Sequence, residues 1–204
     1  MIIGISGKSG SGKTTLANQI STIIKKESVH LDIDKVGHKV LTKKEVFEEL
    51  KKSFGEEIVK SNVINRKKLG ELVFTSRNKM EKLNEITWKH MQIEIDSFLE
   101  NNKNKVIILD WLLLPITKYF DQCDIKILLD IPYEIRKKRA MQRDNISEKA
   151  FDLRDNSSID LNPAEFDYVL REINNEDIKR MVKKIWQEYY SQEVLIQLQK
   201  VIWM

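Results

Sequence analysis

The sequence predicts an α/β fold in which helices cover both faces of a parallel five-stranded sheet. Short apolar runs recur along the chain and alternate with longer stretches whose apolar residues share one helical face. The chain has 204 residues, of which 41% are hydrophobic and 32% charged, a balance that excludes a disordered protein. We therefore expect a single domain over residues 1–204 with a sizeable buried core.

The first third of the chain predicts two strands, a helix and an insert. Residues 1–6 form an apolar run that predicts a buried strand, and residues 14–26 predict a helix with its apolar positions on one face. A second short strand over residues 29–31 leads into two aspartates. Residues 35–103 look helical throughout, and Ser76 is placed to cap the longest of these helices.

The second half of the chain continues the alternation. Apolar runs at residues 106–110 and 125–131 predict two more buried strands. Pro132 suits the first turn of a helix running to about Arg143, because the missing N–H has no helical partner there. The polar residues 145–163 predict a mobile segment. The remaining elements are a last strand over residues 167–170 and a terminal helix over residues 174–204.

Composition excludes several classes of protein. No apolar run approaches the roughly 18–20 residues of a membrane span, and the N-terminus lacks the features of a signal peptide. Cys123 is the only cysteine, so neither a disulfide framework nor a thiolate metal site is expected. The net charge of +4 is spread along the chain without a basic stripe, so no nucleic-acid partner is expected. We expect a cytoplasmic protein, with a monomer as the default oligomeric state.

Four of the seven glycines fall between Gly4 and Gly12, and residues 7–14 fit the pattern G-x-x-x-x-G-K-[ST]. A loop that wraps around phosphates needs positive φ angles and backbone N–H groups without side chains in the way. The pattern lies between a predicted strand and a predicted helix, which is the context of a P-loop NTPase fold that binds ATP with Mg²⁺. The candidate nucleotide ligands are Gly7, Ser9, Gly10, Ser11, Gly12, Lys13, Thr14 and Thr15.

Metal binding is assigned to two oxygen donors. The hydroxyl group of Thr14 is expected to ligate Mg²⁺. Asp110 ends an apolar strand, where it could act as the second acid of the metal site or cap the next helix. The three histidines have no metal-ligand spacing.

Among P-loop proteins, the pattern favours a small-molecule kinase. Residues 34–37 match the D-x-x-G string of GTPases, but no N-K-x-D guanine-reading motif follows. Asp32 and Asp34 end the second strand, where an extended i, i+2 pair would point both carboxylates toward an acceptor hydroxyl. Residues 35–103 are the candidate acceptor-binding insert and residues 140–163 the lid region. The lid arginines would be Arg136, Arg139, Arg143 and Arg154.

Each of these residues also has a structural interpretation. Asp32 or Asp34 could cap a helix, and the i, i+4 spacing of Arg139 and Arg143 also describes a solvated helix face.

The order of further motifs resembles the dephospho-coenzyme A kinase family over most of the chain. In that family an Asp-x-Asp follows the second strand, often with a histidine nearby. The matching segments are Asp32-Ile33-Asp34 with His38, Phe54-Gly55, Arg66-Lys67-Lys68-Leu69, Val73-Phe74, Leu83-Asn84, Gln142-Arg143-Asp144 and Arg154. The chain departs from the family pattern at Lys8-Ser9, Trp88-Lys89 and Trp111, and near Ile159.

The resemblance implies transfer of the ATP γ-phosphate to the ribose 3′-hydroxyl of dephospho-coenzyme A, giving coenzyme A and ADP. It implies Asp34 as the general base, with Lys13 and Arg143 stabilising the phosphoryl group. It also implies that Asp32, Asp34, His38, Arg66 and Asn84 bind the acceptor, and that Arg139 and Arg154 bind ATP. A nucleoside or nucleotide kinase is the alternative, and a non-catalytic nucleotide-binding module is a second one.

Overall fold

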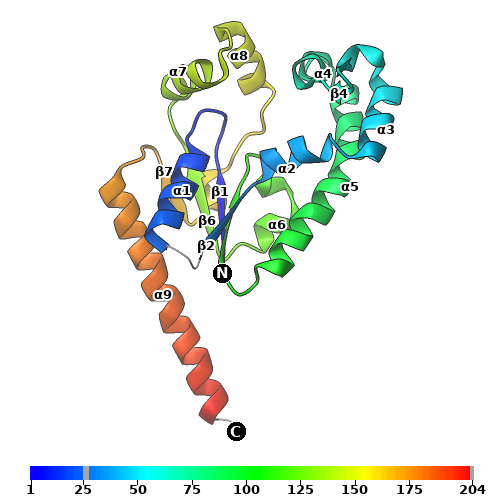
Figure 1. Cartoon of the computed structure of the whole chain (residues 1–204). Helices are drawn as coiled ribbons and strands as arrows, with labels where there is room; N and C mark the ends of the chain where they lie inside the picture. Colours follow the sequence, from blue (N-terminus) through cyan, green and yellow to red (C-terminus); the bar gives the residue numbers. More distant parts are fainter. Residues whose placement is uncertain (25–27, 203–204) are drawn as a thin grey trace.

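The structure of the chain is a computed structural model that describes residues 1–24 and 28–202, with side chains described up to residue 188 (Figure 1). The predicted ends of the first helix, at residue 26, and of the last helix, at residue 204, lie outside the described residues. None of the described helices is long and apolar enough to cross a membrane.

A parallel five-stranded sheet forms the centre of the molecule, as the sequence predicts. Its order is β2-β5-β1-β6-β7, and every neighbouring pair is parallel. The strands are β1 (Ile2–Ser6), β2 (Ser28–Asp32), β5 (Val106–Asp110), β6 (Ile125–Leu129) and β7 (Tyr168–Leu170). β5 is buried along its whole length, which explains its unbroken apolar sequence.

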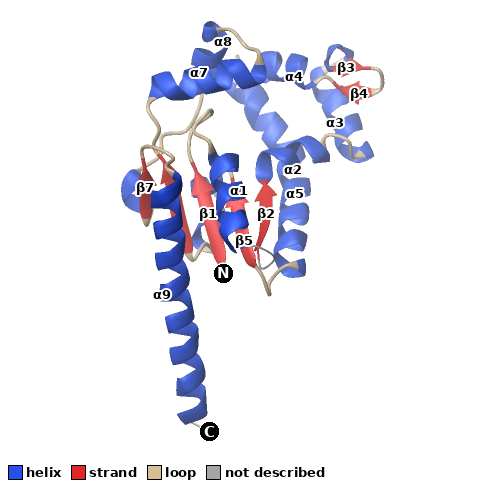
Figure 2. Cartoon of the chain, turned by 60° about the vertical axis from the view of Figure 1, so that its left-hand side comes forward, coloured by secondary structure: helices blue, strands red, loops and turns tan. Residues whose placement is uncertain are grey.

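Helices cover both faces of the sheet, which explains why its central strands carry few polar residues. One face packs against α1 (Lys13–Ile24) and the first part of α9 (Asn175–Ile202), and the rest of α9 projects from the body (Figure 2). The other face packs against α2 (Ile33–Val40), α5 (Arg77–Asn101), the 3-10 helix η3 (Leu114–Ile116) and α6 (Lys118–Asp121).

The insert between β2 and β5 has an apolar core of its own, and it is not entirely helical. α3 (Lys44–Phe54), η2 (Glu56–Ile58) and α4 (Arg66–Val73) pack against the first half of α5. An antiparallel hairpin of β3 (Val59–Lys60) and β4 (Val63–Ile64) interrupts them, which corrects the prediction of helix throughout. Ser61 and Asn62 form its turn with φ angles of 51° and 61°, a conformation that helices exclude.

Two helices lie above the carboxyl edge of the sheet (Figure 2). α7 (Tyr133–Asp144) matches the predicted helix. The stretch 145–163, predicted to be a mobile segment, contains α8 (Glu148–Asn156) and the start of the 3-10 helix η4 (Pro163–Glu165). Ser147 caps α8 by accepting a hydrogen bond from the N–H of Ala150 at 3.3 Å. Phe151 is fully buried, 5.6 Å between centroids from the Tyr133 ring, and this packing fastens α8 onto α7.

Candidate active site

The Gly-rich loop joins β1 to α1 directly beneath α7 and α8 (Figure 2). Gly10 and Gly12 have φ angles of +79° and +94°, which L-residues with side chains rarely adopt. A Cβ on Gly10 would lie 2.2 Å from the backbone oxygen of Arg136, so the loop packs against α7 without space for a methyl group. Because α1 begins at Lys13, its free N–H groups and its dipole are directed at the loop. This is the geometry of an anion site.

Thr14 and Asp110 meet at the base of this loop. The Thr14 hydroxyl donates to Asp110 Oδ2 at 2.7 Å, and the Asp110 side chain is buried. The next helix has Leu113 as its N-cap residue, so Asp110 does not cap it. A hydroxyl and a carboxylate oxygen are hard donors that suit Mg²⁺. Among the described residues no group of three or more His, Cys, Asp or Glu side chains could hold a metal, so a cation here would also need phosphate oxygens.

His30 lies beside this pair in β2. Its Nε2 is 3.5 Å from Asp110 Oδ2 and makes no hydrogen bond with the described residues.

Asp32 ends β2 whereas Asp34 lies in a helix, which corrects the prediction of an extended pair whose side chains point the same way. Asp32 is the N-cap residue of α2: its Oδ1 accepts from the N–H of Lys35 at 3.2 Å, and its Oδ2 lies 3.1 Å from Lys35 Nζ. Asp34 lies in the first turn of α2. The helix begins at Ile33, two residues before the predicted start of the insert at residue 35, so only Asp32 belongs to the strand.

Asp34 lies among charged groups from several elements. Its carboxylate is solvent accessible, but surrounding protein removes part of its hydration and raises its pKa. Lys13 opposes this rise, Asp32 and Asp110 add to it, and His38 opposes it weakly. The structure therefore brings the strand ends, α1 and α2 together around one carboxyl group.

α7 and α8 contribute a second charged cluster centred on Asp144. Arg143 donates to the two Asp144 oxygens at 2.7 and 2.9 Å, and Arg154 Nη1 lies 2.5 Å from Oδ2. These bonds lower the pKa of Asp144 to about 2. The bonds to Asp144 are also the main reason that the pKa of Arg143 is raised, with a further contribution from Asp34. Arg143 is therefore close enough to interact electrostatically with Asp34 across the site.

Of the other two predicted lid arginines, Arg139 lies near the Gly-rich loop and Arg136 is buried. Arg139 is exposed, with Nη1 3.9 Å from where a Cβ on Gly12 would lie. Arg136 is buried, and its guanidinium is bound by the carbonyls of Ile131 and Ser9 and by Asp155. The prediction that Arg136 screens the transferred phosphoryl group is therefore wrong. Its contact with Asp155, 19 residues away, carries no signal in the sequence.

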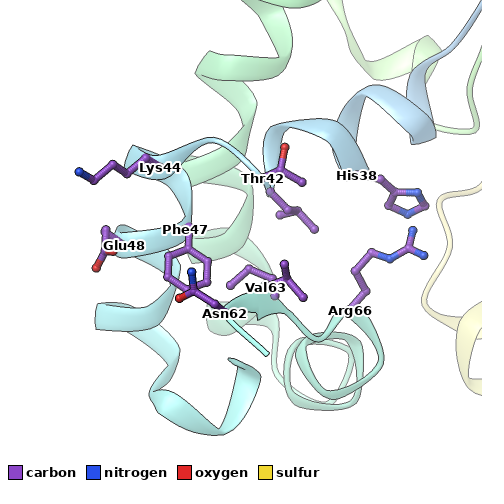
Figure 3. Close-up of a pocket in the computed structure, with 10 residues that line it drawn as sticks. His38, Thr42, Lys44, Phe47, Glu48, Asn62, Val63 and Arg66 are labelled. Carbon is purple, nitrogen blue, oxygen red and sulfur yellow. The ribbon is translucent and has the colours of Figure 1, made fainter. Parts of the chain in front are cut away.

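A cavity of about 530 Å³ opens in the insert beside α2 (Figure 3). His38 and Arg66 lie next to each other at one end, and Lys44 and Glu48 lie at the other. Partial burial lowers the pKa of His38, and the positive charge of Arg66 lowers it further. The apolar part of the lining, which the sequence analysis did not identify, comes from Leu41, Phe47, Val63 and Ile64.

Two further predicted site residues are exposed. Asn84 is exposed on α5 and does not line the cavity. Thr15 is exposed on the first turn of α1. The predicted residues that the structure gathers at the carboxyl edge of the sheet are Gly7, Ser9, Gly10, Ser11, Gly12, Lys13, Thr14, Asp32, Asp34, His38, Asp110, Arg139, Arg143 and Arg154.

Comparisons with known proteins point to one family. The family model described as dephospho-CoA kinase matches residues 1–193. A dephospho-CoA kinase of Aquifex aeolicus is 33% identical over 192 residues, covering 91% of this chain and 96% of the relative. One of Fusobacterium nucleatum is 31% identical over 188 residues, covering 91% and 95%.

Solved structures agree with this fold. The Thermus thermophilus protein TT1252 superimposes with a TM-score of 0.75 at 26% identity, covering 92% of this chain and 97% of its own. A dephospho-CoA kinase from Campylobacter jejuni has the same fold, with a TM-score of 0.63 at 24% identity over 94% of this chain and 98% of its own. The family match over nearly the whole chain, together with relatives above 30% identity, shows that the chain belongs to the dephospho-CoA kinase family.

Proposed function

We propose that this chain transfers the γ-phosphoryl group of ATP to the ribose 3′-hydroxyl of dephospho-coenzyme A. One observation carries the proposal. Asp34 interacts electrostatically with Lys13 of the anion loop, with Arg143 of the lid and with His38 of the insert cavity. A carboxylate in this place can act on a hydroxyl group that approaches from the cavity while a triphosphate occupies the loop.

The phosphate donor would occupy the Gly-rich loop. Backbone N–H groups of the loop and the N-terminus of α1 favour a polyphosphate, and Lys13 adds a full positive charge. Arg139, Arg143 and Arg154 would complete the enclosure from the lid. In this interpretation, nucleotide competes with Asp144 for the guanidinium groups of Arg143 and Arg154.

The acceptor would occupy the cavity of the insert. Dephospho-coenzyme A joins an anionic pyrophosphate to a long, largely neutral arm, and the lining of the cavity offers both kinds of contact. Arg66 can bind an anionic oxygen, while Phe47 and Val63 provide apolar surface. His38 lies on α2 one turn after Asp34, which connects the cavity to the proposed base.

The transfer step needs one bond made and one bond broken. The 3′-oxygen forms a bond to the γ-phosphorus as the bond from that phosphorus to the β,γ-bridging oxygen breaks, and the hydroxyl proton passes to the Asp34 carboxylate. Lys13 and Arg143 stabilise the charge on the phosphoryl oxygens. α7 and α8, the proposed lid helices, would exclude water, which would otherwise compete as the acceptor.

Thr14 and Asp110 would hold Mg²⁺ at the base of the loop, Thr14 through its hydroxyl and Asp110 through its carboxylate. When bound there, the ion neutralises charge on the β- and γ-phosphates. A fluorescent or NMR titration with Mn²⁺ as a Mg²⁺ substitute, comparing the unmodified chain with Asp110→Asn in the presence of ADP, tests this assignment without turnover.

The experiment that tests the function is a coupled assay of ADP release with a panel of acceptors. We expect turnover with dephospho-coenzyme A and none with nucleosides or nucleotides. Turnover with a nucleoside or nucleotide instead would identify a kinase with a different acceptor. Tight ATP binding without acceptor-dependent ADP release would indicate a non-catalytic nucleotide-binding module.

A further inference from the structure

Arg136 and Asp155 form a buried ion pair that joins the two lid helices. Their side chains are 8% and 11% exposed, which leaves both charges almost without water. Arg136 donates from Nη1 to Asp155 Oδ1 at 2.5 Å and from Nη2 to Oδ2 at 3.2 Å. A buried ion pair is maintained only when its remaining donors also find acceptors, because each unpaired group is costly.

The remaining donors of Arg136 reach two other segments. Nη1 also donates to the carbonyl oxygen of Ser9 at 3.3 Å, and Nε donates to the carbonyl oxygen of Ile131 at 2.9 Å. One guanidinium therefore joins α8, the Gly-rich loop and the β6–α7 connection. The backbone of Arg136 contacts the same loop, since a Cβ on Gly10 would lie 2.2 Å from its carbonyl oxygen.

We infer that Arg136 and Asp155 are positioning residues for ATP, an inference that rests on the proposed function. The Ser9 carbonyl, bound by Arg136, cannot turn into the concavity where phosphates would meet the loop N–H groups. Asp155 fixes α8 so that the preceding residue, Arg154, faces the loop, with Nη1 3.5 Å from Ser9 Oγ. The pair acts through the loop and through Arg154 and does not itself contact the nucleotide.

A second ion pair between the same helices provides a matched control. Lys137 of α7 pairs with Glu148 of α8, and the Glu148 side chain is 61% exposed. This pair links the lid helices without reaching the Gly-rich loop. If the Arg136–Asp155 pair acted only by holding α7 and α8 together, disrupting either ion pair would weaken ATP binding to a similar degree.

The decisive variant is the double substitution Arg136→Met with Asp155→Leu. Apolar replacement of a buried ion pair is often neutral or stabilising, so we expect an unchanged or raised melting temperature. Loss of the loop anchor should weaken ATP binding about 10- to 100-fold, measured by calorimetry without acceptor. The control double variant, Lys137→Gln with Glu148→Gln, should keep the ATP affinity of the unmodified chain.

Two results would overturn the inference. One is wild-type ATP affinity in the folded Arg136→Met/Asp155→Leu variant, and the other is equal weakening in the Lys137 and Glu148 control. If the double variant does not fold, the shape-conserving Asp155→Asn provides the same comparison. ATP affinity and melting temperature are then measured together, and normal affinity would again refute the role. Failure of the proposed function is distinguishable, because it would appear as absent acceptor turnover in the unmodified chain, whereas this comparison needs no acceptor.

Discussion

Replacing Gly10 by alanine tests the architecture of the phosphate site with a single methyl group. At a φ of +79° an L-residue costs roughly 1–2 kcal/mol. The new Cβ would also lie 2.2 Å from the Arg136 carbonyl oxygen, which is backbone and cannot rotate away. To lengthen this distance to an ordinary contact of 3.4 Å, the loop or α7 would have to move by more than 1 Å. A displacement of about 1 Å at a catalytic site costs on the order of 100-fold in rate.

We therefore expect Gly10→Ala to fold but to lose about 100-fold in kcat/KM for ATP. The assay combines steady-state ADP release, ATP calorimetry and a thermal melt. Gly37→Ala is the matched control, because its Cβ would meet Met91 Cε at an ordinary 3.5 Å within a helix. Wild-type kinetics in Gly10→Ala would refute the tight packing of the loop against α7. An equal loss in Gly37→Ala would show that the effect is not specific to the loop.

Five further predictions concern charged and titrating groups. Lys13→Ala should lower kcat by at least about 100-fold, since it removes a fixed charge from the phosphoryl group, and near-normal turnover in steady-state assays would contradict the loop assignment. Asp34→Asn should lower kcat by about 100- to 10,000-fold while ATP affinity, measured by calorimetry, stays unchanged. Because the pKa of Asp34 is raised, the activity of the unmodified chain should fall as the pH decreases, with a midpoint at a pH above 3.8. The same loss of activity at low pH should persist in His38→Gln. The pKa of Asp144 is lowered to about 2, so its ionised form stabilises the fold above about pH 4 and loses that contribution as the pH falls toward 2. Asp144→Asn should therefore unfold at a lower urea concentration than the unmodified chain at pH 7, and this difference in stability should narrow between about pH 4 and 2. Burial raises the pKa of Cys123 to about 12, so iodoacetamide should label it slowly at pH 8 until urea unfolds the chain, and fast native labelling would contradict its burial.

The sheet and the nucleotide loop were predictable because their signals are local. Three apolar runs identify the central strands β1, β5 and β6, since a strand covered on both faces has little room for polar residues. The Gly-rich pattern encodes positive φ angles directly, as at Gly10 and Gly12. The proximity of Thr14 to Asp110 was also predictable, because Thr14 follows β1 closely, Asp110 ends β5, and the carboxyl ends of neighbouring parallel strands lie at the same edge of the sheet.

Features that depend on tertiary contacts could not be predicted from the spacing of residues in the sequence. Residues 145–163 look irregular by composition, but buried Phe151 packs against Tyr133 and stabilises α8. The short β3–β4 hairpin depends on a two-residue turn at Ser61 and Asn62, which the helical pattern on either side obscures. The role of Arg136 depends on Asp155 and on the Ser9 carbonyl, which are remote in sequence.

The most direct test of the central claim follows the labelled phosphate itself. The chain is incubated with γ-labelled ATP, Mg²⁺ and dephospho-coenzyme A, and the labelled product is identified by mass spectrometry and ³¹P NMR. Our account predicts that the label appears as a phosphomonoester on the ribose 3′-oxygen and that Asp34→Asn nearly abolishes its formation. Label released only as inorganic phosphate, or found on another acceptor, would contradict it.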